Sequence, residues 1–252
     1  MGKAPEKPEM IFPQLTADYR GIFGENLEAI ILYGSGAGND YLPGKSDLNF
    51  LIVLTDRGIA DLERAMDTAS RWRKSRVTTP LFMTKDYISS SLDAYPIEFL
   101  DMKMNHVTVY GEDVLAGLEI NPEHLRLQVE RELRGKLLLL RGRYLETEGK
   151  EKAVRRLIRE SLPAFLSAFK ALLWLMGHDI PRERRDIITA AAREAGVAAE
   201  AFLDCLAIRE ERDGLSKEEV MAVFRNYLRE IDDLCRRIDG MSFTTAYMNI
   251  LN

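Results

Sequence analysis

The sequence predicts two parts of different fold class: an α/β domain with a mixed sheet at residues 1–120, then an all-α helical bundle at residues 121–252. Three observations carry this prediction. Short apolar runs alternate with helical patterns up to Asn121-Pro122, strand-like runs stop there, and later apolar residues recur at helical spacing. With 252 residues, of which 46% are hydrophobic and 30% charged, the chain has the length for two domains and a globular composition.

Several stretches of the first part are expected to be strands. Residues 29–33 (AIILY) and 48–54 (LNFLIVL) are apolar throughout, as in strands buried on both faces. Residues 77–83 (VTTPLFM) form a further strand, in which Pro80 favours an edge position or a bulge. Residues 97–102 and 107–110 are interpreted as two more strands or as one bent strand.

Helices are expected between and after these strands. Residues 59–76 carry apolar side chains at the spacing of an amphipathic helix, and residues 86–92 form a short one. In the second part, Pro163 should kink or break a helix, Gly196 is a suitable helix stop, and "SKEE" from Ser216 matches a capping box. The five helices expected there are residues 122–148, 151–177, 181–195, 198–209 and 216–239.

Charge and composition exclude several classes of function. The formal net charge of −5 argues against nucleic acid as the main partner. Cys205 and Cys235 make no CxxC pair and no disulfide framework, and are expected to be buried thiols. The N-terminus lacks an apolar core of signal-peptide length, and no apolar stretch reaches the length of a membrane span. We therefore expect a cytoplasmic protein.

The stretch "ILYGSGAGNDYLPGKSDLNFLIVL", residues 31–54, invites three phosphate-binding interpretations. A Walker A loop needs its first glycine where Asn39 stands, and a helix after Ser46 where an apolar strand is expected. A dinucleotide fingerprint begins well at Gly34 and Gly36 but also needs its last glycine at Asn39. Both are rejected.

The third interpretation is a Gly-Ser turn after a strand, then a loop, then an aspartate that opens the next strand. This order resembles the nucleotidyltransferase superfamily, which includes aminoglycoside nucleotidyltransferases and DNA polymerase beta. The motif covers residues 30–54, and the order of an α/β domain followed by helices extends the resemblance over most of the chain. It implies an NTP, with ATP the first choice, and Mg²⁺. It also implies a nucleotide-binding set of Gly34, Ser35 and Ser46.

The resemblance implies catalytic and metal-ligating roles for Asp47, Asn49 and a third residue. Residues two apart on a strand point to one face, so Asp47 and Asn49 should project together toward the Gly34-Ser35 turn. Position 49 is the departure from the family, which has its second carboxylate there. An amide carries no charge and cannot neutralise a second metal ion, so two-metal catalysis is in doubt.

The third acid has two candidates, Glu98 and Asp101, which alternation places on opposite faces of the expected strand. We favour Glu98, as a metal ligand or a general base. These residues also have ordinary structural interpretations. Glu98 and Asp101 are then solvated acids on an edge strand, and Asp47 caps an Asx turn at the end of its loop. The basic residues Arg71, Arg73, Lys74 and Arg76 are expected to complement the dipole of a helix end, with contact to phosphate as the alternative.

Two functions follow from these observations. The first is an enzyme that transfers a nucleoside monophosphate from an NTP to an unidentified small-molecule or protein acceptor. The second is a catalytically degraded domain of the same fold, which binds a nucleotide or a protein partner. The feature that distinguishes the two functions is Asn49, which stands where the family has its second carboxylate.

Overall fold

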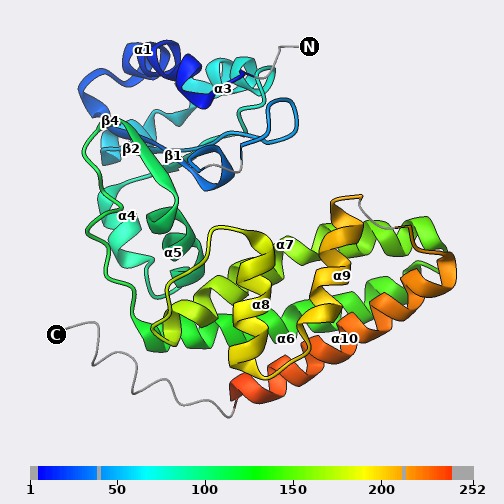
Figure 1. Cartoon of the computed structure of the whole chain (residues 1–252). Coiled ribbons are helices and arrows are strands. Elements are labelled where there is room, and N and C mark those ends of the chain that lie inside the picture. Colours follow the sequence, from blue (N-terminus) through cyan, green and yellow to red (C-terminus); the bar gives the residue numbers. More distant parts are fainter. Residues whose placement is uncertain (1–4, 39–40, 212–213, 240–252) are drawn as a thin grey trace. The chain divides into compact units, whose positions relative to one another are not determined.

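The computed structural model describes residues 5–38, 41–211 and 214–239 (Figure 1). It divides into two compact units, Met1–Ile120 and Asn121–Asn252. Within the described residues, all four strands lie in the first unit and the second contains helices without strands. The predicted fold class, a mixed sheet followed by a helical region, is confirmed.

The first unit is built on a four-stranded sheet in the order β3-β2-β1-β4. Its strands are β1 (Leu27–Tyr33), β2 (Asn49–Leu54), β3 (Leu81–Met83) and β4 (His106–Gly111). Strand β1 runs antiparallel to β2 and β4, whereas β2 runs parallel to β3. Residues 29–32 and 50–54 are all buried, which agrees with the two apolar runs predicted to be strands buried on both faces.

Helices cover both faces of this sheet (Figure 1). One face carries α1 (Phe12–Phe23) and α3 (Met66–Arg73), and the other carries α4 (Lys85–Ser90) and α5 (Pro96–Met104). On the α1 face, alternate strand residues meet the helices in one buried cluster, which includes Leu15, Tyr19, Phe23, Ile30, Leu32, Leu48, Phe50, Ile52, Trp72 and Val77. This alternation fixes which strand residues point to the opposite, α5 face.

The strand expected at residues 97–102 is wrong, because this stretch is helix α5. Pro96 stands in the first helical turn, where its missing N–H removes no hydrogen bond. Buried side chains at Ile97 and Leu100, and at Phe99 and Met102, are each three residues apart. Because Ile97 and Phe99, and Leu100 and Met102, are also two apart, a run this short fits strand alternation equally well in the sequence.

The helix expected at residues 59–76 is divided into α2 (Asp56–Ala60), a 3-10 turn (Leu62–Ala65) and α3. Helix α3 ends at Arg73, and Arg76 has a φ of 62°, in the left-handed region that no right-handed helix includes. The next strand is also shorter than expected. Val77 makes only an isolated bridge to Leu48, and β3 begins after Pro80, at the edge of the sheet.

The second unit contains five helices in its described residues, close to the predicted ranges: α6 (Pro122–Glu146), α7 (Glu151–Leu175), α8 (Arg184–Ala195), α9 (Ala199–Arg209) and α10 (Lys217–Asp239). Helix α7 contacts the other four and runs unbroken through Pro163, so the break expected there is absent. An aromatic core joins α7, α9 and α10, and consists of Phe165, Phe169, Phe202, Phe224 and Tyr227.

The helix ends of the second unit follow the sequence signals. Gly196 ends α8 with a φ of 68°, and the Ser216 N–H donates to Glu219 Oε2 at 2.8 Å, as in a capping box. No helix in the described ranges has the length and apolar character needed to cross a membrane.

Candidate functional site

Polar side chains gather where β1 ends and β2 begins, on the α5 face of the sheet. Tyr33, the last residue of β1, pairs with Asn49, the first residue of β2. Because Leu48 and Phe50 point into the cluster under α1, Asn49 points to the opposite face. The predicted placement of Asn49 beside the Gly34-Ser35 turn follows from this pairing.

The turn itself is a short 3-10 segment, Gly34–Gly36, that lies against the start of β2. Gly34 has a φ of +74°, and a Cβ built on it would lie 3.6 Å from Asn49 Nδ2. A Cβ on Gly36 would lie only 2.8 Å from Leu48 Cδ2, so Gly36 permits close packing of the turn. The two glycines therefore serve different needs: Gly34 a backbone conformation, and Gly36 a contact.

The donors of the turn differ from the sequence expectation. The Gly34 N–H donates to the Asn105 carbonyl at 2.9 Å, so this amide is already used within the protein. The Ser35 hydroxyl is half-buried and makes no hydrogen bond to another described residue. Ser35, rather than the Gly34 amide, is thus the group of this turn that could donate to a phosphate oxygen.

Asn49 is held in one orientation by Thr78. The Thr78 hydroxyl lies 2.9 Å from Asn49 Oδ1 and 3.3 Å from the Leu48 carbonyl, and donates to the nearer oxygen. With its oxygen turned to Thr78, the amide presents its nitrogen to Gly34. Asn49 is therefore arranged as a hydrogen-bond donor at the turn, whereas a metal ligand would present its oxygen.

Asp47 and Arg76 form an ion pair one step further along the same face. The residues before β3 run beside those before β2, since the Leu48 N–H donates to the Arg76 carbonyl at 2.9 Å. Arg76 Nη2 lies 3.0 Å from Asp47 Oδ1 and donates to the Lys45 carbonyl at 2.8 Å. Arg76 lies beyond the end of α3, so the helix-dipole explanation does not apply to it.

Ser46 is engaged in the loop that leads to Asp47. Its hydroxyl accepts from the Leu42 N–H at 3.0 Å, and its own N–H donates to the Leu42 carbonyl at 2.8 Å. These bonds close a turn just before β2. The contacts of Ser46 thus give it a part in shaping the loop, and its predicted contact with nucleotide stays a prediction.

Glu98 and Asp101 stand on α5, not on a strand as expected. Glu98 is exposed in the first turn of the helix, whereas Asn105, which touches Gly34, follows its last turn. Asn105 stands seven positions after Glu98, about 10 Å along the axis at 1.5 Å per residue. Its role as third acid stays a prediction.

We use the name polar row for Ser35, Asp47, Asn49, Arg76 and Thr78. Sequence reasoning missed Thr78 and favoured the dipole explanation for Arg76. No periodic signal joins these two residues, because Arg76 has a left-handed backbone and strand alternation does not extend to it. The parallel pairing that sets them beside Asp47 and Asn49 could not be inferred from the sequence.

The donors of the polar row do not fit a resident magnesium ion. Mg²⁺ prefers several oxygen ligands in octahedral arrangement. Here the only carboxylate of the row is paired with a guanidinium, and the amide oxygen of Asn49 is turned to Thr78. In the described parts of the chain, no three acidic, histidine or cysteine side chains cluster as a metal site would require.

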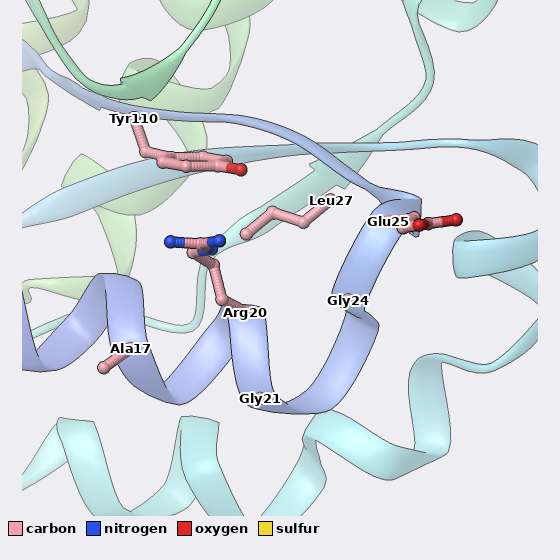
Figure 2. Close-up of a pocket in the computed structure, with 7 residues that line it drawn as sticks. All are labelled: Ala17, Arg20, Gly21, Gly24, Glu25, Leu27 and Tyr110. Atoms are coloured by element: carbon pink, nitrogen blue, oxygen red, sulfur yellow. The ribbon is translucent and has the colours of Figure 1, made fainter.

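A separate hollow lies at the other end of β1, on the α1 face. Its volume is about 650 Å³, and it is lined by Ala17, Arg20, Gly21, Gly24, Glu25, Leu27 and Tyr110 (Figure 2). Arg20 rises from α1 toward Tyr110, with its guanidinium carbon 5.3 Å from the ring centre. Leu27, which lines the hollow, begins β1, and the turn follows Tyr33 at its other end, about 20 Å along the strand. The hollow and the polar row are therefore distinct places.

Comparisons with known proteins identify the fold. No protein-family model matches the chain. A CCA-adding enzyme from Pyrobaculum islandicum is 29% identical over 119 residues, which make up 46% of this chain but only 27% of that enzyme. Spectinomycin adenyltransferase from Enterococcus faecialis, solved with ATP and spectinomycin, matches at a TM-score of 0.50 and 14% identity, over 90% of this chain and 99% of that one. The chain has the nucleotidyltransferase fold, as the motif resemblance implied.

Proposed function

We propose that this protein is a nucleotide-binding module of nucleotidyltransferase fold, which holds the phosphate groups of an NTP at the Gly34-Ser35 turn and transfers nucleotidyl groups slowly or not at all. The observation that carries this proposal is the orientation of Asn49. Its amide nitrogen faces the turn, where a donor suits a phosphate oxygen, and its oxygen accepts from Thr78. ATP is the first choice of nucleotide, because the adenyltransferase of the same fold was solved with ATP.

Each residue of the proposed site has a physical task. Gly34 leaves space above the backbone, so that a phosphate group can approach it closely. The Ser35 hydroxyl and the Asn49 amide nitrogen donate to phosphate oxygens. Unpaired thiols at Cys205 and Cys235, both buried, agree with the cytoplasmic location that we propose.

A second candidate is nucleotidyl transfer to a small-molecule or protein acceptor. Retention of Asp47 at the start of β2 favours it, as does the likeness of nearly the whole chain to an adenyltransferase. In that reaction an acceptor hydroxyl oxygen attacks the α-phosphorus, the bond to the bridging oxygen breaks, and pyrophosphate leaves. A single carboxylate, already paired with Arg76, would hold poorly the cation that neutralises the negative charge of this transition state.

Calorimetric titration of the full chain with ATP tests the first proposal. We expect binding by the wild type, and about 10- to 100-fold weaker binding by Ser35→Ala, the loss expected for one hydrogen bond to a charged oxygen. Ser90→Ala on α4 is the matched control and should bind as the wild type does. No binding of ATP, GTP, CTP or UTP by the wild type would overturn the proposal. Brisk release of pyrophosphate from ATP would favour the second candidate.

A further inference from the structure

Arg76 has three features that its surroundings do not explain. Its backbone is left-handed, with a φ of 62°, which costs free energy for a residue with a side chain. Its Nε is buried and has no hydrogen-bond partner among the described residues. Its ion pair with Asp47 is partly exposed, and such pairs add little stability. Strain and an unsatisfied donor together suggest a role other than stability.

The fold brings the Arg76 side chain to the same face as the Gly34-Ser35 turn. Val77 is buried in the cluster under α1, so alternation points Thr78 to the α5 face. The contact of Thr78 with Asn49 agrees with this direction. Arg76 has a left-handed backbone, and its ion pair with Asp47 is what places its guanidinium on this face. Two strand spacings, about 10 Å, separate the Arg76 backbone from the turn, a gap that a triphosphate chain can span.

The donors on this face are still available for a ligand. A guanidinium carries five N–H donors: in Arg76 the Nε donor is buried and Nη2 is engaged with Asp47 and Lys45, so the two N–H groups of Nη1 are the ones left for a ligand. Asn49 presents its Nδ2 on the same face, next to the turn. The row thus combines a guanidinium, the Asp47 carboxylate paired with it, and neutral donors, at the place where the family resemblance implies metal ions.

We propose that Arg76 and Asn49 hold the phosphate groups of the nucleotide in place of a divalent cation, so that NTP binding needs no metal ion. This inference rests on the nucleotide-binding function proposed above. The two N–H groups of Arg76 Nη1 can donate to phosphate oxygens, and the charge of the guanidinium cannot be lost near neutral pH. Asp47 is then a positioning residue, which aims the guanidinium through their ion pair. Magnesium lowers the negative charge of ATP, so it should not strengthen the binding.

The test compares ATP titrations of the full chain in EDTA and in excess Mg²⁺. The wild type should bind ATP in EDTA at least as tightly as in Mg²⁺. Arg76→Asn should bind about 10- to 100-fold more weakly in EDTA, because it loses charge-assisted hydrogen bonds. Asparagine tolerates a left-handed backbone, so this variant limits the effect of strain. Arg76→Lys keeps the positive charge but replaces the guanidinium with an ammonium. Its affinity for ATP in EDTA should lie between those of the wild type and Arg76→Asn.

Controls separate a local contact from a general effect of charge. Arg73→Asn removes the same charge from an exposed residue of α3 whose side chain bonds only to Ser70 among the described residues, and should bind ATP as the wild type does. Adenosine lacks phosphate, so any affinity for adenosine should be equal in wild type and Arg76→Asn. Thermal melts report whether each variant folds.

The outcomes are distinct. Wild-type binding that requires Mg²⁺ would overturn this inference and leave the nucleotide-binding function in place, whereas no binding in either buffer would overturn both. Equal binding by Arg76→Asn and wild type in EDTA would show that Arg76 only pins the loop. If Arg76→Asn fails to fold, Thr78→Val decides. It releases the Asn49 amide and should weaken binding in EDTA about 3- to 10-fold, and unchanged binding would contradict the inference.

Discussion

The polar row of the first unit and the aromatic core of the second are built from opposite choices of side chain. In the core, Phe202 is fully buried between Phe169 and Tyr227, with ring centres 4.9 and 5.6 Å away. In the row, Arg76 keeps a strained backbone and a buried donor without a partner. Large apolar contacts stabilise a fold, whereas unsatisfied donors cost free energy. We therefore expect the core to determine stability and the row to determine binding.

Truncation in the aromatic core should have the largest effect on stability. Phe202→Ala removes a fully buried ring and its two edge-to-face contacts, so we expect a loss of about 3–5 kcal/mol in the free energy of unfolding. Differential scanning calorimetry measures it. At a temperature where the variant is still folded, its affinity for ATP should be unchanged. A large change in affinity would mean that core and row are not independent.

Asn49→Asp should change the row from a metal-independent to a metal-responsive site. It places a second carboxylate beside Asp47 and removes the amide donor, and a divalent cation relieves the repulsion between two acids. At Mg²⁺ about tenfold above its Kd, we expect a stabilisation of about 1.4 kcal/mol, which the wild type should not show. Thermal melts with EDTA and with Mg²⁺ measure the difference.

The control for this variant is Asp47→Asn in the Asn49→Asp background, which should remove the response to metal. An Asn49→Asp protein whose melting temperature ignores Mg²⁺ would contradict the placement of residue 49 in the row.

The smallest effect should come from a helix end of the second unit. Ser216→Ala removes the hydroxyl of the capping box at the start of α10, where Ser216 Oγ lies 2.8 Å from Glu219 Oε2. We expect a loss of about 1 kcal/mol, and no change in ATP affinity. Urea unfolding gives this value. A loss as large as that of Phe202→Ala would mean that the cap does more than satisfy exposed backbone groups.

Much of the fold could be predicted from the sequence because its signals are local and strong. The apolar runs of β1 and β2, the glycine after α8 and the capping box before α10 each depend on a few neighbouring residues. The stretch at Ile97–Met102 could not be assigned, because its apolar residues form pairs two apart, as in a strand, as well as pairs three apart, as in a helix. The division of residues 59–76 depends on a tertiary fit that has no periodic signal.

Only the part of the candidate site that lies on β1, β2 and the loop between them could be predicted from the sequence. Antiparallel pairing of neighbouring strands places Gly34 beside Asn49, and alternation places Asp47 on the same face. Arg76 and Thr78 arrive through parallel pairing across a crossover, and nothing in the sequence states which strand is the neighbour. The orientation of the Asn49 amide depends on the hydrogen bond from the Thr78 hydroxyl. It could therefore not be predicted without knowing that Thr78 lies beside Asn49.

The hydrogen bond from Arg76 to the Lys45 carbonyl also bears on how the loop before β2 meets a protease. Trypsin cleaves after lysine and must take the carbonyl oxygen of that lysine into its own oxyanion hole. At Lys45 this oxygen already accepts from Arg76 Nη2, although the residue is exposed. Cleavage at Lys45 therefore has to wait for local opening of the loop, and its rate reports the Arg76 contact in the absence of any nucleotide.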